Sequence, residues 1–232
     1  MLFVGFGSFA MGLLSFPVAR EWKGRIQERF RPSNEPKDLR HWNDKCAEFD
    51  GLASARPVVF LGDSRIEEVN WSELLDRCDI SNRGIGWDTT TGLLRRLKGA
   101  LPPNVDCCVI QIGINDLLQG SDIPSMIGRF STILEHITAG THARPIVLSI
   151  IMAGEGQDAL NVKVRASNQQ LAALCNASGI RFVDLNAGLC PAGFLAQEFT
   201  RDGIHLSWKG CVQFRENLTP HLPMKSQQSK TN

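Results

Sequence analysis

The sequence predicts an α/β fold, a three-layer α/β/α sandwich built on a five-stranded parallel sheet. From residue 58 onward, short and continuously apolar segments alternate with longer segments of helical periodicity. Continuous apolar runs are typical of strands buried on both faces, and their alternation with helices favours a parallel sheet covered by helices on both sides. Composition agrees, because 21% charged and 43% hydrophobic residues are usual for a globular protein.

We expect five strands and five helices in alternation. The strands are expected at Val58–Leu61, Cys78–Ser81, Val105–Ile112, Pro145–Ile151 and Ile180–Leu185. The helices are expected at Ile66–Leu75, Thr89–Leu97, Ile123–Ile137, Val162–Ser178 and from an N-cap at Ser207 to Leu218. In open parallel sheets ligands bind at the carboxyl ends of the strands, so the functional residues are expected in the loops that follow them.

Residues 1–19 form an apolar segment that we expect to be a transmembrane anchor. Leu2–Ala19 carries no charge and is just long enough to span a bilayer. A cleaved signal peptide and a buried N-terminal helix stay open as alternatives. Five basic residues follow at once, and by the positive-inside rule they place the rest of the chain on the cytoplasmic side, with the periplasmic or extracellular side left open. They are Arg20, Lys23, Arg25, Arg29 and Arg31.

The remaining domain bounds follow from composition. Residues 20–54 are expected to be a basic and polar linker with a short peripheral helix around Leu39–Phe49. Residues 55–222 are expected to form the single core domain. The polar residues 223–232 are expected to be a disordered tail.

Charge and cysteine usage exclude several classes of function. The net charge is +1 and no basic run is interleaved with aromatic residues, so a nucleic-acid partner is not expected. The seven cysteines include no CxxC pair and no Cys/His cluster at metal-ligand spacing, so no metal is expected. No other cofactor is expected, because the chemistry indicated by the sequence motifs needs none. We expect most cysteines to be buried free thiols, while a Cys190–Cys211 disulfide stays open for an oxidising compartment.

Four short motifs lie after predicted strands or before the last helix, and each contains a residue type that ester hydrolysis requires. They are Gly62–Ser64, Asn82–Thr89, Gly113–Asp116 and Asp202–His205. Each motif is short, and only the ordered set points to a nucleophile, an oxyanion site, a base and a residue that orients the base.

Ser64 follows the first strand and opens a helix, where free N–H groups and the helix dipole stabilise negative charge. Its hydroxyl therefore suits a nucleophile and its N–H an oxyanion donor, although a serine here could also serve only as an N-cap. Asn115 follows the strongest strand, and its amide suits a neutral oxyanion donor, or alternatively a turn. The G-x-S-x-G elbow is absent from the sequence, which disfavours an α/β-hydrolase.

Asp202 and His205 lie three residues apart, beside a glycine. A carboxylate at this spacing can accept one ring N–H of the imidazole, which leaves the other ring nitrogen as a base for Ser64. A loop pair of purely structural purpose is the alternative.

Together these motifs resemble the SGNH hydrolase superfamily, also called GDSL esterases and lipases, over about Val58–Gly210. The resemblance implies a flavodoxin-like fold, Ser64 as nucleophile, and Asp202 and His205 as the rest of the triad. It also implies that Asn115 and the Ser64 N–H complete the oxyanion hole with a backbone N–H of the second motif.

Two positions depart from the family pattern. Arg65 stands where a leucine is usual, and we expect an exposed arginine there or a group that binds an anionic part of the substrate. Trp87 stands where a glycine is usual. Because the oxyanion donor is a backbone N–H, Trp87 can still supply it while its ring walls the acyl pocket. Otherwise Gly86 takes over, or the hole is weakened.

The sequence thus predicts a serine esterase that acts on small-molecule esters, such as an acylated sugar or lipid, with a short acyl or O-acetyl group favoured. The second motif looks most like those of members related to platelet-activating-factor acetylhydrolase and carbohydrate acetylesterases. An acyltransferase, a lysophospholipase or a thioesterase with the same site stays open. A non-catalytic, membrane-tethered binding domain is the alternative from another class.

Overall fold

A parallel five-stranded sheet forms the centre of the protein. The computed structural model describes residues 35–52 and 55–224. The strands are β1 (Val58–Gly62), β2 (Ile80–Gly84), β3 (Cys107–Gln111), β4 (Arg144–Leu148) and β5 (Arg181–Val183). They pair in the order β2-β1-β3-β4-β5, so the chain reverses direction across the sheet between β1 and β3. This order is that of flavodoxin-like folds, in which ligands bind at this switch in strand order.

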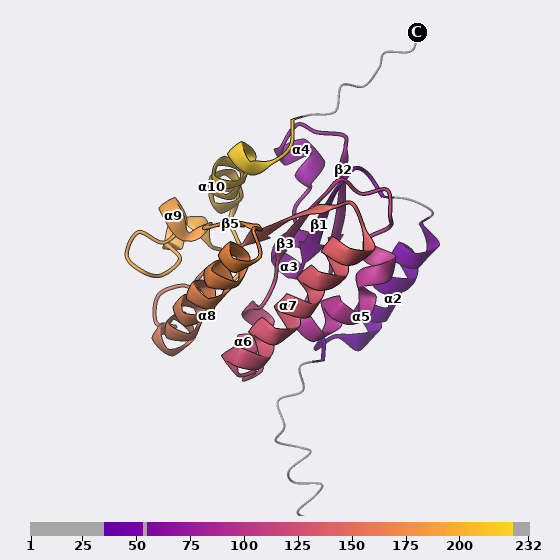
Figure 1. The fold of residues 1–232 in the computed structure, drawn as a ribbon. Coiled ribbons are helices and arrows are strands. Elements are labelled where there is room, and N and C mark those ends of the chain that lie inside the picture. Colours follow the sequence, from indigo (N-terminus) through magenta and orange to yellow (C-terminus); the bar gives the residue numbers. More distant parts are fainter. Residues whose placement is uncertain (1–34, 53–54, 225–232) are drawn as a thin grey trace, which may run out of the picture. The chain divides into compact units, whose positions relative to one another are not determined.

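Helices cover both faces of the sheet, as the alternating sequence pattern predicts. One face is covered by α2 (Leu39–Gly51), α5 (Thr90–Ala100), α7 (Ile123–Gly140) and α8 (Asp158–Ala177). Each of these helices contacts the next one, and Figure 1 shows them side by side. The other face packs against α3 (Ser64–Glu67), α4 (Trp71–Leu74), α9 (Asn186–Leu189) and α10 (Trp208–Leu218). The short elements α6 (Ile114–Leu118), η1 (Gln197–Phe199) and η2 (Thr219–His221) complete the described chain.

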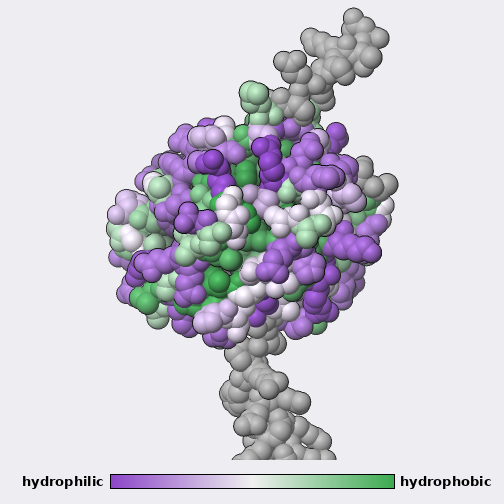
Figure 2. Space-filling view, in the orientation of Figure 1, coloured by the Kyte–Doolittle hydropathy of each residue, from purple (hydrophilic) through white to green (hydrophobic). Residues whose placement is uncertain are grey.

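Every β1 residue is buried, and so is every β3 residue, which explains their continuous apolar sequences. On one face of the sheet, Trp71 packs between Phe60 and Phe214, with ring centroids 4.9 Å apart in both pairs. On the surface, hydrophilic side chains cover most of the face drawn in Figure 2, and hydrophobic residues show between them in smaller patches.

Three elements differ from the sequence-based expectation. The helix expected at Ile66–Leu75 is divided into α3 and α4, because Asn70 caps a new helix through its side chain. The segment after β3, for which a turn was one alternative, forms α6. The strand expected at Cys78–Ser81 begins and ends later, at Ile80–Gly84.

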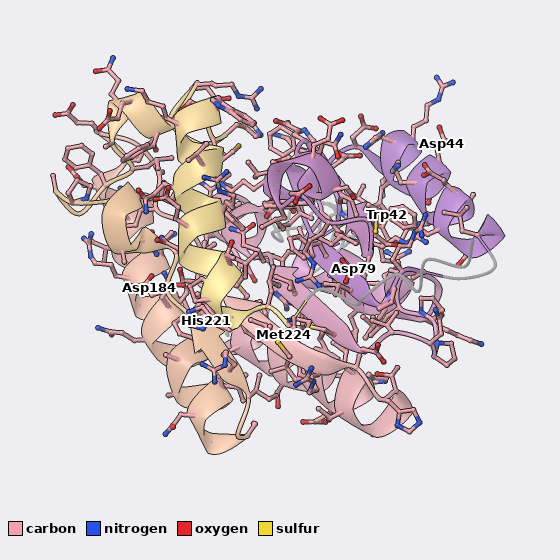
Figure 3. All side chains as sticks on the ribbon, turned by 90° about the horizontal axis from the view of Figure 1, so that it is seen from above. Trp42, Asp44, Asp79, Asp184, His221 and Met224 are labelled. Atoms are coloured by element: carbon pink, nitrogen blue, oxygen red, sulfur yellow. The ribbon has the colours of Figure 1, made fainter. Side chains whose placement is uncertain are left out.

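Helix α2, expected as a peripheral element, packs into the core through Trp42 and Phe49, which are 7% and 2% exposed. In Figure 3, Trp42 lies between α2 and the rest of the domain, while Asp44 lies on the outer side of the helix. Helix α2 is therefore held against α5 by buried apolar surface.

The apolar segment expected to cross a membrane, the basic residues after it and most of the expected tail lie outside the described residues. Within residues 35–52 and 55–224, no helix is both long enough and apolar enough to span a bilayer.

Cys190 and Cys211 are free thiols, so the disulfide between them does not form. Of the seven cysteines, only three are fully buried, fewer than expected.

Candidate active site

Ser64 is the first residue of α3, directly beyond the carboxyl end of β1. The N-cap is Asp63, whose side chain accepts the N–H of Arg65, so Ser64 does not cap this helix. Its hydroxyl is directed elsewhere, with Oγ 3.0 Å from Nε2 of His205. Two glycines allow α3 to approach the strands this closely. A Cβ on Gly62 would lie 2.2 Å from the Gln111 carbonyl oxygen, and one on Gly84 would lie 2.3 Å from the Glu67 nitrogen.

His205 is fixed by the loop that carries it. Oδ2 of Asp202 lies 2.6 Å from Nδ1 of His205, and Oδ1 accepts the backbone N–H groups of Ile204 and His205 at 2.9 and 2.7 Å. A carboxylate only accepts, so Nδ1 carries the proton and Nε2 is left to accept from Ser64. The structure therefore brings together the three residues that the sequence predicted as a nucleophile, a base and an orienting carboxylate.

The electrostatics suit these roles. Partial burial alone would raise the pKa of Asp202. Hydrogen bonds from the His205 side chain and from the His205 and Ile204 backbone outweigh it and lower that pKa to about 2. Asp202 is therefore ionised throughout the neutral range and can hold a charged imidazolium during reaction.

Asn115 lies in the first turn of α6, just beyond the carboxyl end of β3. Its side chain is 4% exposed, and Nδ2 donates to the Asp88 carbonyl oxygen at 3.0 Å. An amide carries two N–H groups, so one remains after this bond. The neighbouring Asp116 anchors the turn, because its carboxylate accepts from the Thr90 hydroxyl at 2.5 Å and from Arg129 at 3.1 Å.

The loop of the second motif joins β2 to α5 and contacts Glu67 of α3 and Trp42 of α2. Trp87 is in the left-handed region with φ of 61°, which agrees with the glycine usual at this place. Its ring is 44% exposed and lies under the ammonium of Lys37, 4.7 Å from the ring centroid. The Gly86 N–H donates to Oε2 of Glu67 at 2.6 Å, so it is not free for an oxyanion as the alternative required.

Arg65 is not the exposed side chain that the sequence suggested, since it is only 2% exposed. Its guanidinium donates to the carbonyl oxygens of Ile204 at 2.8 Å, Ile151 at 2.7 Å and Met152 at 3.5 Å. Three of the five N–H groups of the guanidinium thus donate to backbone carbonyls of other loops. Arg65 also lines the cavity at Ser64, so its binding of an anionic part of the substrate stays a prediction.

Sequence reasoning missed the buried ion pair below the second motif. Asp88 accepts from Nε of Arg96 at 2.7 Å and from Nε1 of Trp42 at 3.0 Å, and neither charged side chain exceeds 2% exposure. Burial raises the pKa of Asp88, and Arg96 opposes that shift. The apolar spacing of α5 gave no sign of this pairing, because it marks only the apolar face of the helix and not the partners of its charged residues.

A cavity of about 190 Å³ opens beside the serine and the histidine. It is large enough for a small ester group and is bordered by a charged pair, Glu68 and Arg201. Its lining residues are Ser64, Arg65, Glu68, Val69, Arg201, His205, Leu206, Trp208 and Cys211. In the described part of the chain, no group of three or more His, Cys, Asp and Glu side chains could hold a metal ion.

Comparison with known proteins agrees with this fold. The human platelet-activating factor acetylhydrolase IB subunit alpha2 is 28% identical over 168 residues, which cover 69% of this chain and 73% of that protein. A structure described as a putative platelet activating factor from Streptococcus pneumonia has a TM-score of 0.75 at 24% identity, over 88% of this chain and 99% of that one.

More distant structures share the fold. The acetylxylan esterase Axe2 from Geobacillus stearothermophilus has a TM-score of 0.62 at 15% identity, and the match covers 75% of this chain and 98% of that one. The family model of GDSL-like lipases and acylhydrolases matches residues 60–211, which include all four motifs. The chain belongs to the GDSL-like lipase/acylhydrolase family, whose members are esterases and other hydrolases.

Proposed function

We propose that the protein is a serine esterase that removes a short acyl group, such as acetyl, from a small-molecule ester through Ser64, His205 and Asp202. The observation that carries this proposal is the continuous line of contacts from Oδ2 of Asp202 to Nδ1 of His205, at 2.6 Å, and from Nε2 of His205 to Oγ of Ser64, at 3.0 Å. This is the arrangement that activates a serine hydroxyl in unrelated hydrolase folds.

The reaction follows from these contacts. Oγ of Ser64 bonds to the ester carbonyl carbon while its proton passes to Nε2 of His205, and the carbonyl oxygen becomes an oxyanion. The N–H groups of Ser64 and Trp87 and the free amide N–H of Asn115 stabilise that oxyanion. The C–O bond to the alcohol breaks, and the alcohol leaves with the proton from His205. Water then repeats these steps on the acyl-enzyme and releases the carboxylic acid.

One structural observation supports a short acyl group. The cavity at Ser64, whose lining residues do not include Trp87, measures only about 190 Å³. The similar proteins named above also include an acetylhydrolase and an acetylxylan esterase.

Hydrolysis of p-nitrophenyl acetate, butyrate and octanoate by the full chain tests this proposal. We expect turnover that decreases with acyl length and that is lost in Ser64→Ala, whereas Ser72→Ala in α4 keeps the wild-type rate. Turnover that survives in Ser64→Ala would overturn the proposal. Product analysis with added alcohols separates hydrolysis from acyl transfer, because only transfer yields a new ester.

Membrane attachment through residues 1–19 is a separate part of the proposal. It rests on the charge-free segment and on the basic residues after it, which favour a cytoplasmic domain. Sedimentation of the full chain with membranes after carbonate washing is the expected result, and its release by carbonate would contradict it.

A further inference from the structure

Glu67 lies one helical turn after Ser64, and its carboxylate holds the loop of the second motif. Oε2 of Glu67 accepts the Gly86 N–H at 2.6 Å, and Oε1 accepts from Nε2 of His41 at 2.8 Å. The Glu67 side chain is 22% exposed, so water competes only in part for these bonds. Hydrogen bonds to a carboxylate are shorter and stronger than neutral ones.

These bonds decide which N–H groups are available near Ser64. The Gly86 N–H is committed to Glu67, whereas the next N–H along the chain, that of Trp87, makes no hydrogen bond to any other described residue. On the far side of Trp87, the Asp88 carbonyl oxygen accepts from the Asn115 side chain at 3.0 Å. Hydrogen bonds thus fix the backbone on both sides of Trp87, at the Gly86 N–H and at the Asp88 carbonyl oxygen. The Trp87 N–H between them has no partner among the described residues.

Helix α2 contributes to the same loop at three places. His41 holds Glu67, Nε1 of Trp42 donates to Oδ1 of Asp88 at 3.0 Å, and Lys37, just before the helix, covers the Trp87 ring. All three residues precede residues 60–211, which the family model matches. A segment outside that match therefore contacts the oxyanion loop directly.

We propose that Glu67, supported by His41, is a positioning residue that withdraws the Gly86 N–H and fixes the Trp87 N–H as the loop's oxyanion donor. On this account α2 helps to position the oxyanion loop, through its contacts with Glu67 and Asp88. The inference rests on the proposed esterase function, because an oxyanion forms only in that reaction. Glu67 itself touches no reacting atom.

The physical consequence is specific to the transition state. The Trp87 N–H binds the oxyanion of the transition state much more strongly than the neutral ester of the bound substrate. Displacement of the loop should therefore lower kcat and leave KM almost unchanged. In known hydrolases, loss of one oxyanion donor costs about 10²–10³-fold in kcat. Loss of a residue that only positions such a donor is expected to cost less.

The test uses three variants of the full chain and one matched control. We expect Glu67→Ala to lower kcat for p-nitrophenyl acetate by about 10–100-fold, with KM within about twofold of wild type. Glu67→Gln keeps an oxygen that accepts the Gly86 N–H, so it should recover most of this loss. His41→Ala should show a smaller loss of the same kind. Asp44→Ala, on the outer side of α2, should match wild type.

Two further readouts separate positioning from a merely structural role. Affinity for a boronic acid that forms a tetrahedral adduct on Ser64 should fall in parallel with kcat. By NMR, the Gly86 amide proton should exchange faster in Glu67→Ala, and this result does not depend on any esterase activity. If Glu67→Ala does not fold, Glu67→Gln and His41→Ala provide the same comparison.

A kcat in Glu67→Ala within about twofold of wild type, in a folded protein whose Ser64→Ala variant is inactive, would overturn the inference alone. The inference would also be overturned if Glu67→Gln did not recover the lost kcat and if kcat decreased in step with the melting temperature of the variants. Absence of Ser64-dependent hydrolysis in the wild type would instead refute the proposed function.

Discussion

Oγ of Ser64 lies 3.0 Å from Nε2 of His205, although 141 residues separate them in the sequence. One residue begins α3 and the other belongs to the loop before α10, so only the completed sheet brings them together. Asp202 on that same loop sets the tautomer of His205, and this relationship leads to the first prediction.

Asp202→Asn should lower kcat by about 10²–10⁴-fold with little change in KM. The amide cannot accept the Nδ1 proton with the strength of a carboxylate, so the imidazole is no longer held with Nε2 free for Ser64. Steady-state kinetics with p-nitrophenyl acetate measure this effect. Glu198→Gln, at an exposed carboxylate in η1, is the control. Equal rates for Asp202→Asn and wild type would exclude Asp202 from the triad.

Sequence reasoning located the residues of the site because each lies at a strand end or in a short motif whose spacing is local. The Asp202–His205 pair needs only a three-residue loop, and Ser64 and Asn115 follow the two most apolar strands. Parallel strand order then places these ends at one edge of the sheet.

The contacts that hold the site could not be predicted in this way. The Glu67–His41 pair joins α3 to α2, and Arg65 binds loops that lie 86 to 139 residues away. Such contacts depend on side-chain direction and on packing between elements, which hydrophobic periodicity does not encode. The break at Asn70 was missed for a related reason, because a capping side chain interrupted a helix whose apolar spacing continued.

Trp87→Gly should change the acyl-chain preference of the enzyme. The variant keeps the backbone N–H and is free of the left-handed strain, which costs a non-glycine residue about 1–2 kcal/mol. It removes the ring at the oxyanion loop, so kcat/KM for the octanoate ester should rise at least about tenfold relative to that for the acetate ester. Trp87→Ala removes the ring and keeps the strain, so it should show the same shift in preference. An unchanged preference in both variants would show that the ring does not border the acyl group.

Arg65→Met should destabilise the fold by about 3 kcal/mol, because three backbone carbonyls of buried or half-buried loops lose their donor. Arg65→Lys should not restore stability, since one ammonium cannot reproduce the forked geometry of a guanidinium. Urea unfolding gives the comparison, with the exposed Arg95→Met expected within about 0.5 kcal/mol of wild type. A fully stable Arg65→Met that binds substrate more weakly would contradict this structural role and favour a substrate-binding role for Arg65.

Asp63 predicts a pH dependence of stability. The side chain is fully buried, and its Oδ2 atom has no hydrogen-bond partner within the described chain. Burial raises the pKa of Asp63 from 3.8 to about 6, although Arg65 opposes the shift. Because the folded-state pKa is the higher one, the native protein binds more protons between these values, and its stability falls as pH rises through this window.

Asp63→Asn removes that titration. The free energy of unfolding of Asp63→Asn, relative to wild type, should therefore rise by about 1–1.5 kcal/mol between about pH 5 and about pH 8. Ser72→Ala changes no titratable group and should give a difference that does not vary with pH. If the difference in the free energy of unfolding between Asp63→Asn and wild type stayed constant or fell with pH, the pKa of Asp63 would not be raised in the native protein.

The central claim is that Ser64 carries the acyl group, and peptide mass spectrometry after rapid acid quenching tests it most directly. With p-nitrophenyl acetate, the account predicts the added mass of one acetyl group on the peptide that contains Ser64. The label should disappear in Ser64→Ala and should build up far more slowly in His205→Ala. An acetyl group on another residue, or steady hydrolysis by Ser64→Ala without a labelled peptide, would contradict the account.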